Sequence, residues 1–280
     1  MNKSNGNKNI KKIKNILSDN KSKGSDEIDL LFLIDATASM GPYIIAAKQE
    51  SKNISEELRK LYPEKKFKYG YIFYRDPIDS HSDIHECINL TDKVNDLTEQ
   101  LGKIDVYGGG DLPEDWAGAY KMANEKISWG NGDKIIIHLA DAGAHGKLFT
   151  KNDNYPQEEE KLIKELEKCA LKNITIFGYI IQEDARNSFE ESAKIYRSKG
   201  GFFEIFNFCP PEMMNNGMMS PFDMYCMNNM NCMNNMNMNC MNNMNMNYMD
   251  NMYSNQCMLN NNFRMNALNC VAMNMNRNNI

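Results

Sequence analysis

The sequence has no long apolar run and no excess of positive charge. No stretch approaches the roughly 18–20 apolar residues that cross a bilayer, so we expect no membrane span. The formal net charge is −5 with both signs interspersed, so we expect no nucleic-acid partner. The Lys-rich N-terminus lacks the apolar core of a secretory signal. These absences predict a cytoplasmic protein.

Composition divides the chain into three segments. Residues 1–25 are rich in Asn, Lys, Ser and Gly and are expected to form a flexible polar leader. Residues 26–208 have the mixed composition of a globular domain. Residues 209–280 form a Met/Asn-rich low-complexity tail, in which "CMNNMNMN" at 232–239 repeats at 240–247. The tail lacks the varied apolar side chains that fill a core, so we expect it to be disordered.

The cysteines do not indicate a disulfide framework. Six of the eight lie after residue 208, and only Cys87 and Cys169 fall in the globular segment. Disulfide frameworks are typical of small secreted domains, so we expect free thiols.

Apolar runs alternate with segments of helical spacing through the globular segment. The expected strands are 28–36, 66–76, a short edge strand at 84–90, 134–141, 173–181 and 201–206. The expected helices are 43–61, 91–104 with Thr91 as N-cap, 113–127 opening at Pro113, 156–171 and 184–199. This alternation predicts an α/β fold with a doubly wound, Rossmann-like, mostly parallel sheet and helices on both faces.

Oxygen-bearing side chains follow the predicted strands and precede the predicted helices. In such sheets ligands bind beyond the carboxyl ends of the strands. Three loops there carry carboxylates and hydroxyls: "DATAS", "DVYGGGDLPEDW" and "DAGAHG", which contain Asp35, Thr37, Ser39, Asp111, Glu114, Asp115 and Asp141. Converging anions repel one another unless a cation lies between them, and oxygen ligands suit a hard ion such as Mg²⁺.

These three loops resemble the metal-ion-dependent adhesion site of the von Willebrand factor A domain. That family carries Asp-x-Ser-x-Ser on its first loop, which Asp35, Thr37 and Ser39 match with Thr in place of the first Ser. Asp141 matches the third-loop Asp. "GGGDLPEDW" resembles the second loop of a subgroup found in hemicentin-like domains and beside alpha-type kinases. Pro113 takes the place of the usual second-loop Thr, which leaves Asp111, Glu114, Asp115 or a water to complete the site.

The resemblance implies a non-enzymatic protein-binding domain. In this family the ion keeps an open coordination position, and an acidic residue of a partner protein fills it. We therefore expect Mg²⁺, or Mn²⁺ or Ca²⁺ in its place, and an unknown partner protein that presents an Asp or Glu carboxylate. Integrin-like switching uses a C-terminal helix after the last strand, and here Pro210 and Pro211 oppose a helix at that point.

Two other functions stay open from the sequence. The chain could be the regulatory piece of a metal-dependent kinase or hydrolase system, with His145 as the nearest general base. It could instead be an assembly protein that self-associates through its Met/Asn tail.

Several of these residues also have structural interpretations. Asp35 and Ser39 could cap the following helix, since Asp and Ser are favoured there. His138 is expected in the core, His145 in packing at the rim of the site or in support of its loop, and His81 and His85 in an exposed polar loop.

Overall fold

A computed structural model describes residues 25–78, 81–207, 267–268, 271 and 274. Within them, six strands form one sheet in the order β3-β2-β1-β4-β5-β6. The strands are β1 (Glu27–Asp35), β2 (Lys66–Tyr74), β3 (Glu86–Thr91), β4 (Asp133–Ala140), β5 (Ile174–Ile180) and β6 (Phe202–Asn207). All neighbouring pairs are parallel except β2 and β3, so β3 is an antiparallel edge strand. The predicted doubly wound, mostly parallel sheet is confirmed.

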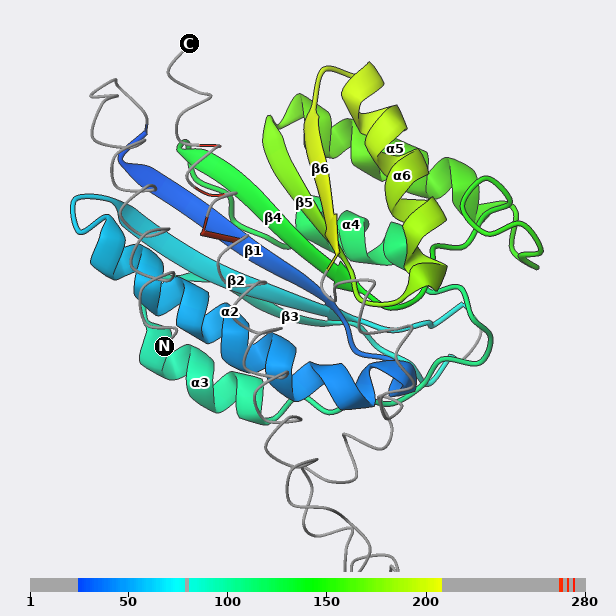
Figure 1. The fold of residues 1–280 in the computed structure, drawn as a ribbon, viewed down its shortest axis with the longest axis horizontal. Coiled ribbons are helices and arrows are strands. Elements are labelled where there is room, and N and C mark those ends of the chain that lie inside the picture. The colour runs from blue at the N-terminus through cyan, green and yellow to red at the C-terminus, as the bar shows by residue number, and fades with distance from the viewer. Residues whose placement is uncertain (1–24, 79–80, 208–266, 269–270, 272–273, 275–280) are drawn as a thin grey trace, which may run out of the picture.

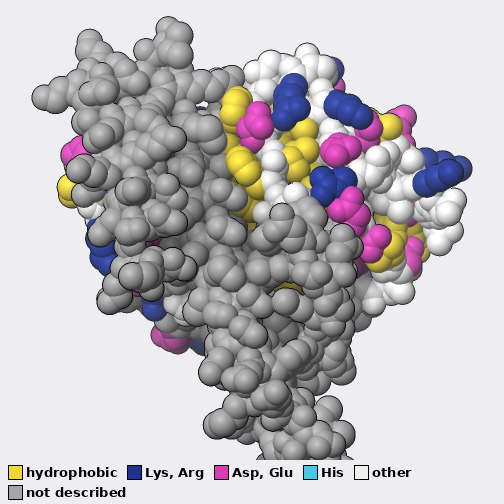
Figure 2. Space-filling model, viewed as in Figure 1, with side chains coloured by type: hydrophobic (Ala, Val, Ile, Leu, Met, Phe, Trp, Pro, Cys, Tyr) yellow, Lys and Arg dark blue, Asp and Glu magenta, His cyan; other side chains and the backbone are white. Residues whose placement is uncertain are grey.

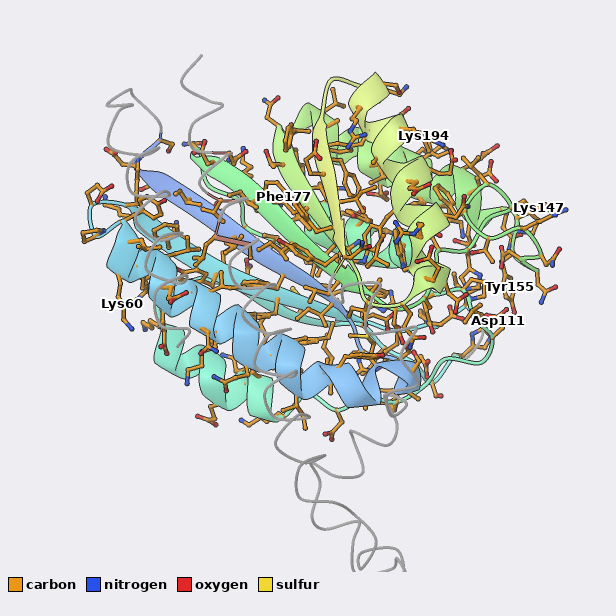
Figure 3. The ribbon with its side chains drawn as sticks, in the orientation of Figure 1. Lys60, Asp111, Lys147, Tyr155, Phe177 and Lys194 are labelled. Atoms are coloured by element: carbon orange, nitrogen blue, oxygen red, sulfur yellow. The ribbon has the colours of Figure 1, made fainter. Side chains whose placement is uncertain are left out.

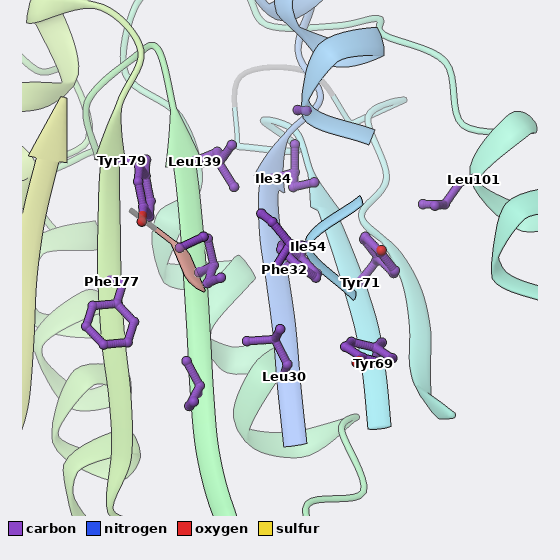
Figure 4. Packing of buried hydrophobic residues seen from close by; sticks show 14 of the residues in the cluster. Leu30, Phe32, Ile34, Ile54, Tyr69, Tyr71, Leu101, Leu139, Phe177 and Tyr179 are labelled. Atoms are coloured by element: carbon purple, nitrogen blue, oxygen red, sulfur yellow. The ribbon is translucent and has the colours of Figure 1, made fainter. Parts of the chain in front are cut away.

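The apolar runs of the central strands serve two separate cores. Leu30, Phe32 and Ile34 of β1 face one core, while Leu31 and Leu33 face the other. Successive side chains of a strand point to opposite faces, so a strand buried on both sides is apolar throughout. Figure 4 shows the first of these layers, in which side chains from β1, β2, β4 and β5 form one continuous apolar surface.

Helices cover both faces of the sheet, as Figure 1 shows. One face carries α2 (Gly41–Leu61) and α3 (Val94–Gly102). The other carries α4 (Trp116–Glu125), α5 (Glu158–Leu171) and α6 (Arg186–Ser198). All eleven strands and helices expected from the sequence are present, with ends that differ by a few residues.

Two predicted helix starts were wrong. Thr91 is the last residue of β3, and its Oγ1 accepts a hydrogen bond from the backbone of Lys93 at 3.1 Å before α3 begins. Pro113 lies outside α4, which starts at Trp116 with Asp115 as its N-cap. The reason at Pro113 is tertiary, since Glu114 forms an isolated parallel bridge with Ala144 and is therefore extended.

Residues near the C-terminus pack on the first core. Ala267, Leu268 and Val271 are at most 4 % exposed there, and the side chains of Asn274 and Thr175 are hydrogen-bonded. Their spacing matches one face of a helix. The boundary at residue 208 did not anticipate this contact. The leader, and the tail apart from these four residues, lie outside the described residues, so the three-segment division stays a prediction.

The described part of the chain bears on the two expectations about membrane spans and charge. None of its helices is long and apolar enough to cross a bilayer. Figure 2 shows acidic and basic side chains interspersed over the coloured part of one face.

Candidate functional site: an acidic cleft at one edge of the sheet

The first loop of the site begins where β1 ends. Asp35 is fully buried, and its Oδ1 accepts hydrogen bonds from the backbone N–H of Thr37 at 2.9 Å and from its hydroxyl at 2.7 Å. The hydroxyl of Thr37 lies 3.1 Å from that of Ser39. The short 3₁₀ turn η1 (Ala38–Met40) follows, and the start of α2 receives no side-chain cap. The capping interpretation of this loop was therefore wrong, and its three oxygens are left to serve another purpose.

The second loop reaches the first through its glycines. The carbonyl of Gly108 accepts a hydrogen bond from Ala38 N at 3.2 Å, and Gly109 N donates to Oδ2 of Asp83 at 3.0 Å. Both glycines have φ of +78°, which side-chain-bearing residues rarely adopt. A Cβ on Gly109 would also lie 3.1 Å from Oε1 of Glu114. Glycine is thus needed here for a close approach to the site.

The third loop follows β4 and binds the second loop by its backbone. Glu114 N donates to the carbonyl of Gly143 at 2.8 Å, so Glu114 lies beside the loop that Asp141 opens. The three loops enclose a cleft of about 180 Å³. We call it the acidic cleft; it is lined by Thr37, Ala38, Ser39, Gly108, Gly109, Asp111, Leu112, Glu114, Asp141, Ala142, Gln182 and Asp184, with Asp35 buried beside Thr37.

The acidic cleft holds more negative charge than its surroundings compensate. No hydrogen-bond donor among the described residues reaches Asp35 Oδ2, Glu114 Oε2 or Asp141 Oδ1, although all three residues are at most 3 % exposed. Burial raises the pKa of Asp35 well above its usual range, and the Asp141 carboxylate raises it further. Burial, then Asp35 and Asp76, raise the pKa of Glu114 to about 11. Burial likewise raises the pKa of Asp141.

A divalent cation fits this arrangement. Buried carboxylates without partners are costly, and a bound cation would satisfy them while the Thr37 and Ser39 hydroxyls supply neutral ligands. Asp35, Thr37, Ser39, Glu114 and Asp141 are the residues that could hold it.

Comparison with known proteins agrees with this arrangement. Residues 29–164 match the family model of the von Willebrand factor A domain. This part of the chain is a von Willebrand factor A domain. The match spans the first and third loops and the whole second loop of the acidic cleft.

The chain has distant relatives among much longer proteins. It is 29% identical over 143 residues to the alpha-protein kinase vwkA of Dictyostelium discoideum, covering 51% of this chain and 23% of that protein. It is 28% identical over 164 residues to a putative ariadne-like RING finger protein, R811, of Acanthamoeba polyphaga mimivirus, covering 55% and 16%. The chain thus spans less than a quarter of either relative.

Solved structures share the arrangement of the A domain only loosely. The pilus adhesin SpaC from Lactobacillus rhamnosus GG, in its open conformation, superposes with a TM-score of 0.47 at 12% identity, over 77% of this chain and 30% of that one. A score this low says nothing about function.

Most residues predicted for the A domain's site lie together. Thr37, Ser39, Asp111, Glu114 and Asp141 line the acidic cleft, as predicted from the three loops. Asp115 has a different environment. Its carboxylate accepts a hydrogen bond from Gly118 N at 2.6 Å, which caps α4, and lies 3.0 Å from Nε2 of His85.

Sequence reasoning missed Asp76, Gln182 and Asp184. Gln182 and Asp184 follow β5 and line the acidic cleft, and Asp184 contributes to the raised pKa of Asp141. Asp76 follows β2 and is fully buried. The signal was available, because the rule that ligands lie beyond strand ends applies to β2 and β5 as well as to β1 and β4.

The histidines of the A domain differ from one another in environment. His138 is confirmed as a core residue, with its Nε2 3.0 Å from the hydroxyl of Tyr74 and its Nδ1 3.1 Å from that of Tyr120. His145 is only 2 % exposed and is held between two carboxylates rather than at the cleft rim. His85 is half-buried through its contact with Asp115, so the expectation of an exposed loop holds for His81 alone.

Proposed function

We propose that the acidic cleft holds a divalent cation through which this A domain binds an acidic residue of a partner protein. Domains of this family are typically adhesion or protein-binding modules. The three loops resemble the family's adhesion site in their order along the chain. The observation that carries the proposal is the set of three buried carboxylates with an oxygen that no described donor reaches.

The ligand chemistry explains why such an ion would bind a partner. Asp35, Glu114 and Asp141 would supply charged ligands to the ion, with Glu114 in the second-loop position where Pro113 offers no side-chain oxygen. The hydroxyls of Thr37 and Ser39 add no charge, so the ion stays electrophilic. Ser39 is exposed, so the ion would be reachable by a carboxylate from outside. Mg²⁺ is the first expectation, with Mn²⁺ and Ca²⁺ as alternatives.

The structure disfavours the hydrolase alternative. The nearest general base predicted from the sequence was His145, whose two ring nitrogens face Asp76 at 3.3 Å and Asp153 at 2.7 Å. A buried imidazole held in this way cannot take a proton from a water in the acidic cleft. Assembly through the Met/Asn tail concerns residues outside the described ones and remains an alternative proposal.

Calorimetric titration of Mg²⁺ into the full-length chain tests the proposal. The full chain is used because Ala267, Leu268 and Val271 belong to the core. We expect binding that is lost in Asp35→Ala and Asp141→Ala and kept in Asp115→Asn, a nearby carboxylate outside the acidic cleft. The partner would then be sought as a protein released by chelator. Equal binding in all four proteins would refute the proposal.

A further inference from the structure

A second group of potential metal ligands lies behind the second loop. One ligand atom each from Asp76, Asp111 and His145 lies within 4.8 Å of the other two. We call these residues the Asp76 cluster. Asp76 follows β2, Asp111 belongs to the glycine-rich loop and His145 to the loop after β4. Adjacent ligands of a divalent ion lie roughly 3 Å apart and opposite ligands roughly 4 Å apart, so the Asp76 cluster would contract around an ion.

The imidazole of His145 is oriented as a metal ligand would be. Its Nδ1 lies 2.7 Å from Oδ1 of Asp153, whose Oδ2 accepts hydrogen bonds from the backbones of Gly146 at 2.6 Å and Tyr155 at 3.0 Å. The Asp153 carboxylate is therefore fixed and directs Nε2 toward Asp76. Metal-bound histidines show this pattern, in which the N–H of the second ring nitrogen donates a hydrogen bond to a carboxylate.

Asp76 provides the independent sign that a ligand is missing. It is fully buried, and its Oδ1 accepts a hydrogen bond from Ile78 N at 3.2 Å. Its Oδ2 has no hydrogen-bond donor among the described residues and lies 3.3 Å from Nε2 of His145, which makes no hydrogen bond either. A buried carboxylate oxygen and a ring nitrogen thus face each other at 3.3 Å, close enough for an ion pair but without the geometry of a hydrogen bond.

Glu114 places the Asp76 cluster next to the acidic cleft. Its carbonyl accepts a hydrogen bond from His145 N at 3.4 Å, while its Oε1 faces Gly109 and the first loop. Figure 3 shows Asp111 on the loops beyond one end of the sheet, at the same end as Tyr155, whose ring packs edge-on against His145 at 5.0 Å.

We propose that Asp76, Asp111 and His145 form a second divalent-cation site, which adjoins the acidic cleft at Asp111 and is selective for a transition-metal ion such as Mn²⁺ over Mg²⁺. The nitrogen ligand sets this preference, because imidazole suits first-row transition metals whereas Mg²⁺ prefers oxygen. With one cation in the acidic cleft and one in the Asp76 cluster, Glu114 would lie between the two ions. The ions would then link the second loop to the loops after β1, β2 and β4. The alternative occupant of the cluster is a proton on His145, which would leave no place for an ion.

Counting bound Mn²⁺ by electron paramagnetic resonance tests this proposal on the full-length, chelator-treated chain. Mn²⁺ is the suitable probe because the cysteines of the tail favour softer ions. We expect His145→Gln to bind one equivalent fewer than the parent, and Asp111→Asn to weaken the same equivalent at least tenfold. Asp111 is only partly buried, so this variant answers the question even where His145→Gln does not fold. His85→Gln is the matched control, since it removes a His–Asp pair outside the Asp76 cluster and should change nothing.

Excess Mg²⁺ separates the two proposals. Excess Mg²⁺ should displace Mn²⁺ from the acidic cleft, which is the equivalent that Asp35→Asn lacks. It should leave Mn²⁺ at the Asp76 cluster, which is the equivalent that His145→Gln lacks. If His145→Gln and Asp111→Asn bind as much Mn²⁺ as the parent, the second site is refuted while the ion of the acidic cleft stands. If only the equivalent that depends on His145 exists, the second site is supported and the proposed function fails.

Discussion

His138 and Asp141 are three residues apart along the chain, yet they lie in buried regions of opposite character. Around His138, the hydroxyls of Tyr74 and Tyr120 satisfy both ring nitrogens, and the rings of Trp116 and Phe189 pack against the imidazole at 4.4 and 5.0 Å. We call this the His138 pocket. In the acidic cleft, Asp141 meets other carboxylates and keeps an oxygen without a donor.

The surroundings of His138 serve the stability of the fold, whereas those of Asp141 serve the binding of a ligand. Both ring nitrogens of the imidazole have partners inside the protein, so His138 needs no ligand. The acidic cleft is incomplete by itself, because its charges have the same sign and low exposure strengthens their repulsion. Such a region lowers the free energy of unfolding, and a ligand that binds the folded state raises it again. Changes in the two regions should therefore have opposite effects in the absence of metal.

The largest expected effect is in the His138 pocket. Phe189→Ala removes a buried ring packed on Trp116 and His138, and should lower the free energy of unfolding by about 3–5 kcal/mol. Urea denaturation followed by tryptophan fluorescence would measure it. Phe189→Leu is the matched control and should cost markedly less. Equal losses in the two variants would mean that the site does not pack as described.

The pH dependence of stability should have opposite signs for the two buried histidines. Burial lowers the pKa of His138 to about 3. Below pH 6.5 the imidazole of His138 binds a proton in the unfolded chain but not in the folded state. Stability therefore falls as the pH drops from 6.5 toward 3. The loss is several kcal/mol at most, since one pKa unit corresponds to about 1.4 kcal/mol. Chemical denaturation across this range should show a shallower loss in His138→Gln.

At His145 the neighbouring carboxylates affect the pKa of the imidazole more than burial does. Burial by itself lowers the pKa, but the hydrogen bond to Asp153 and the negative charges of Asp76 and Asp153 raise it to about 9. This contribution is full below pH 6.5 and is lost as the pH rises from 6.5 through 9. In chelator, His145→Gln should flatten this alkaline loss while leaving the acid limb unchanged. A steeper alkaline loss in the variant would contradict the assigned partners.

A smaller, stabilising effect is expected in the acidic cleft. Glu114→Gln removes one of three crowded carboxylates and offers an amide donor to its neighbours, so in chelator it should raise the free energy of unfolding by about 1–2 kcal/mol. In saturating Mg²⁺ the order should reverse, because the parent gains binding energy that the variant lacks. Denaturation of both proteins with and without Mg²⁺ measures this. A variant that is less stable than the parent in both conditions would show that Glu114 is structural.

The smallest effect concerns the second loop. Gly109→Ala places a side chain at φ of +78° and 3.1 Å from Glu114, and should cost about 1 kcal/mol from the backbone alone. The cost should be accompanied by weaker Mg²⁺ binding, since the new methyl group displaces Glu114. Gly200→Ala, at φ of +80° with open space around it, is the control for backbone strain without that contact. Equal Mg²⁺ affinity in both variants would show that the second loop does not contribute to binding of the ion.

Prediction from the sequence succeeded where side chains act locally. The apolar runs of β1 and β4 predicted buried strands, and the strand ends predicted where Asp35, Thr37 and Asp141 would lie. Prediction was weaker where contacts between residues far apart in the sequence decide the local structure. Pro113 suggested a helix start, but the bridge between Glu114 and Ala144 extends the chain there. Asp115 was grouped with the ligands, yet it caps α4 and contacts His85, 30 positions away in the sequence.

The sequence by itself determined the order of strands and helices, the two apolar faces of the sheet and the three loops that carry oxygen ligands. Periodicity is a local property, and the α/β class that it predicts brings the carboxyl ends of parallel strands to one edge of the sheet. Only the tertiary structure decided that Asp76 and His145 face each other, that Glu114 stands between two groups of ligands, and that Ala267 and Val271 return to the core. Those relations join residues far apart along the chain, and their energies depend on burial and distance, which no linear spacing encodes.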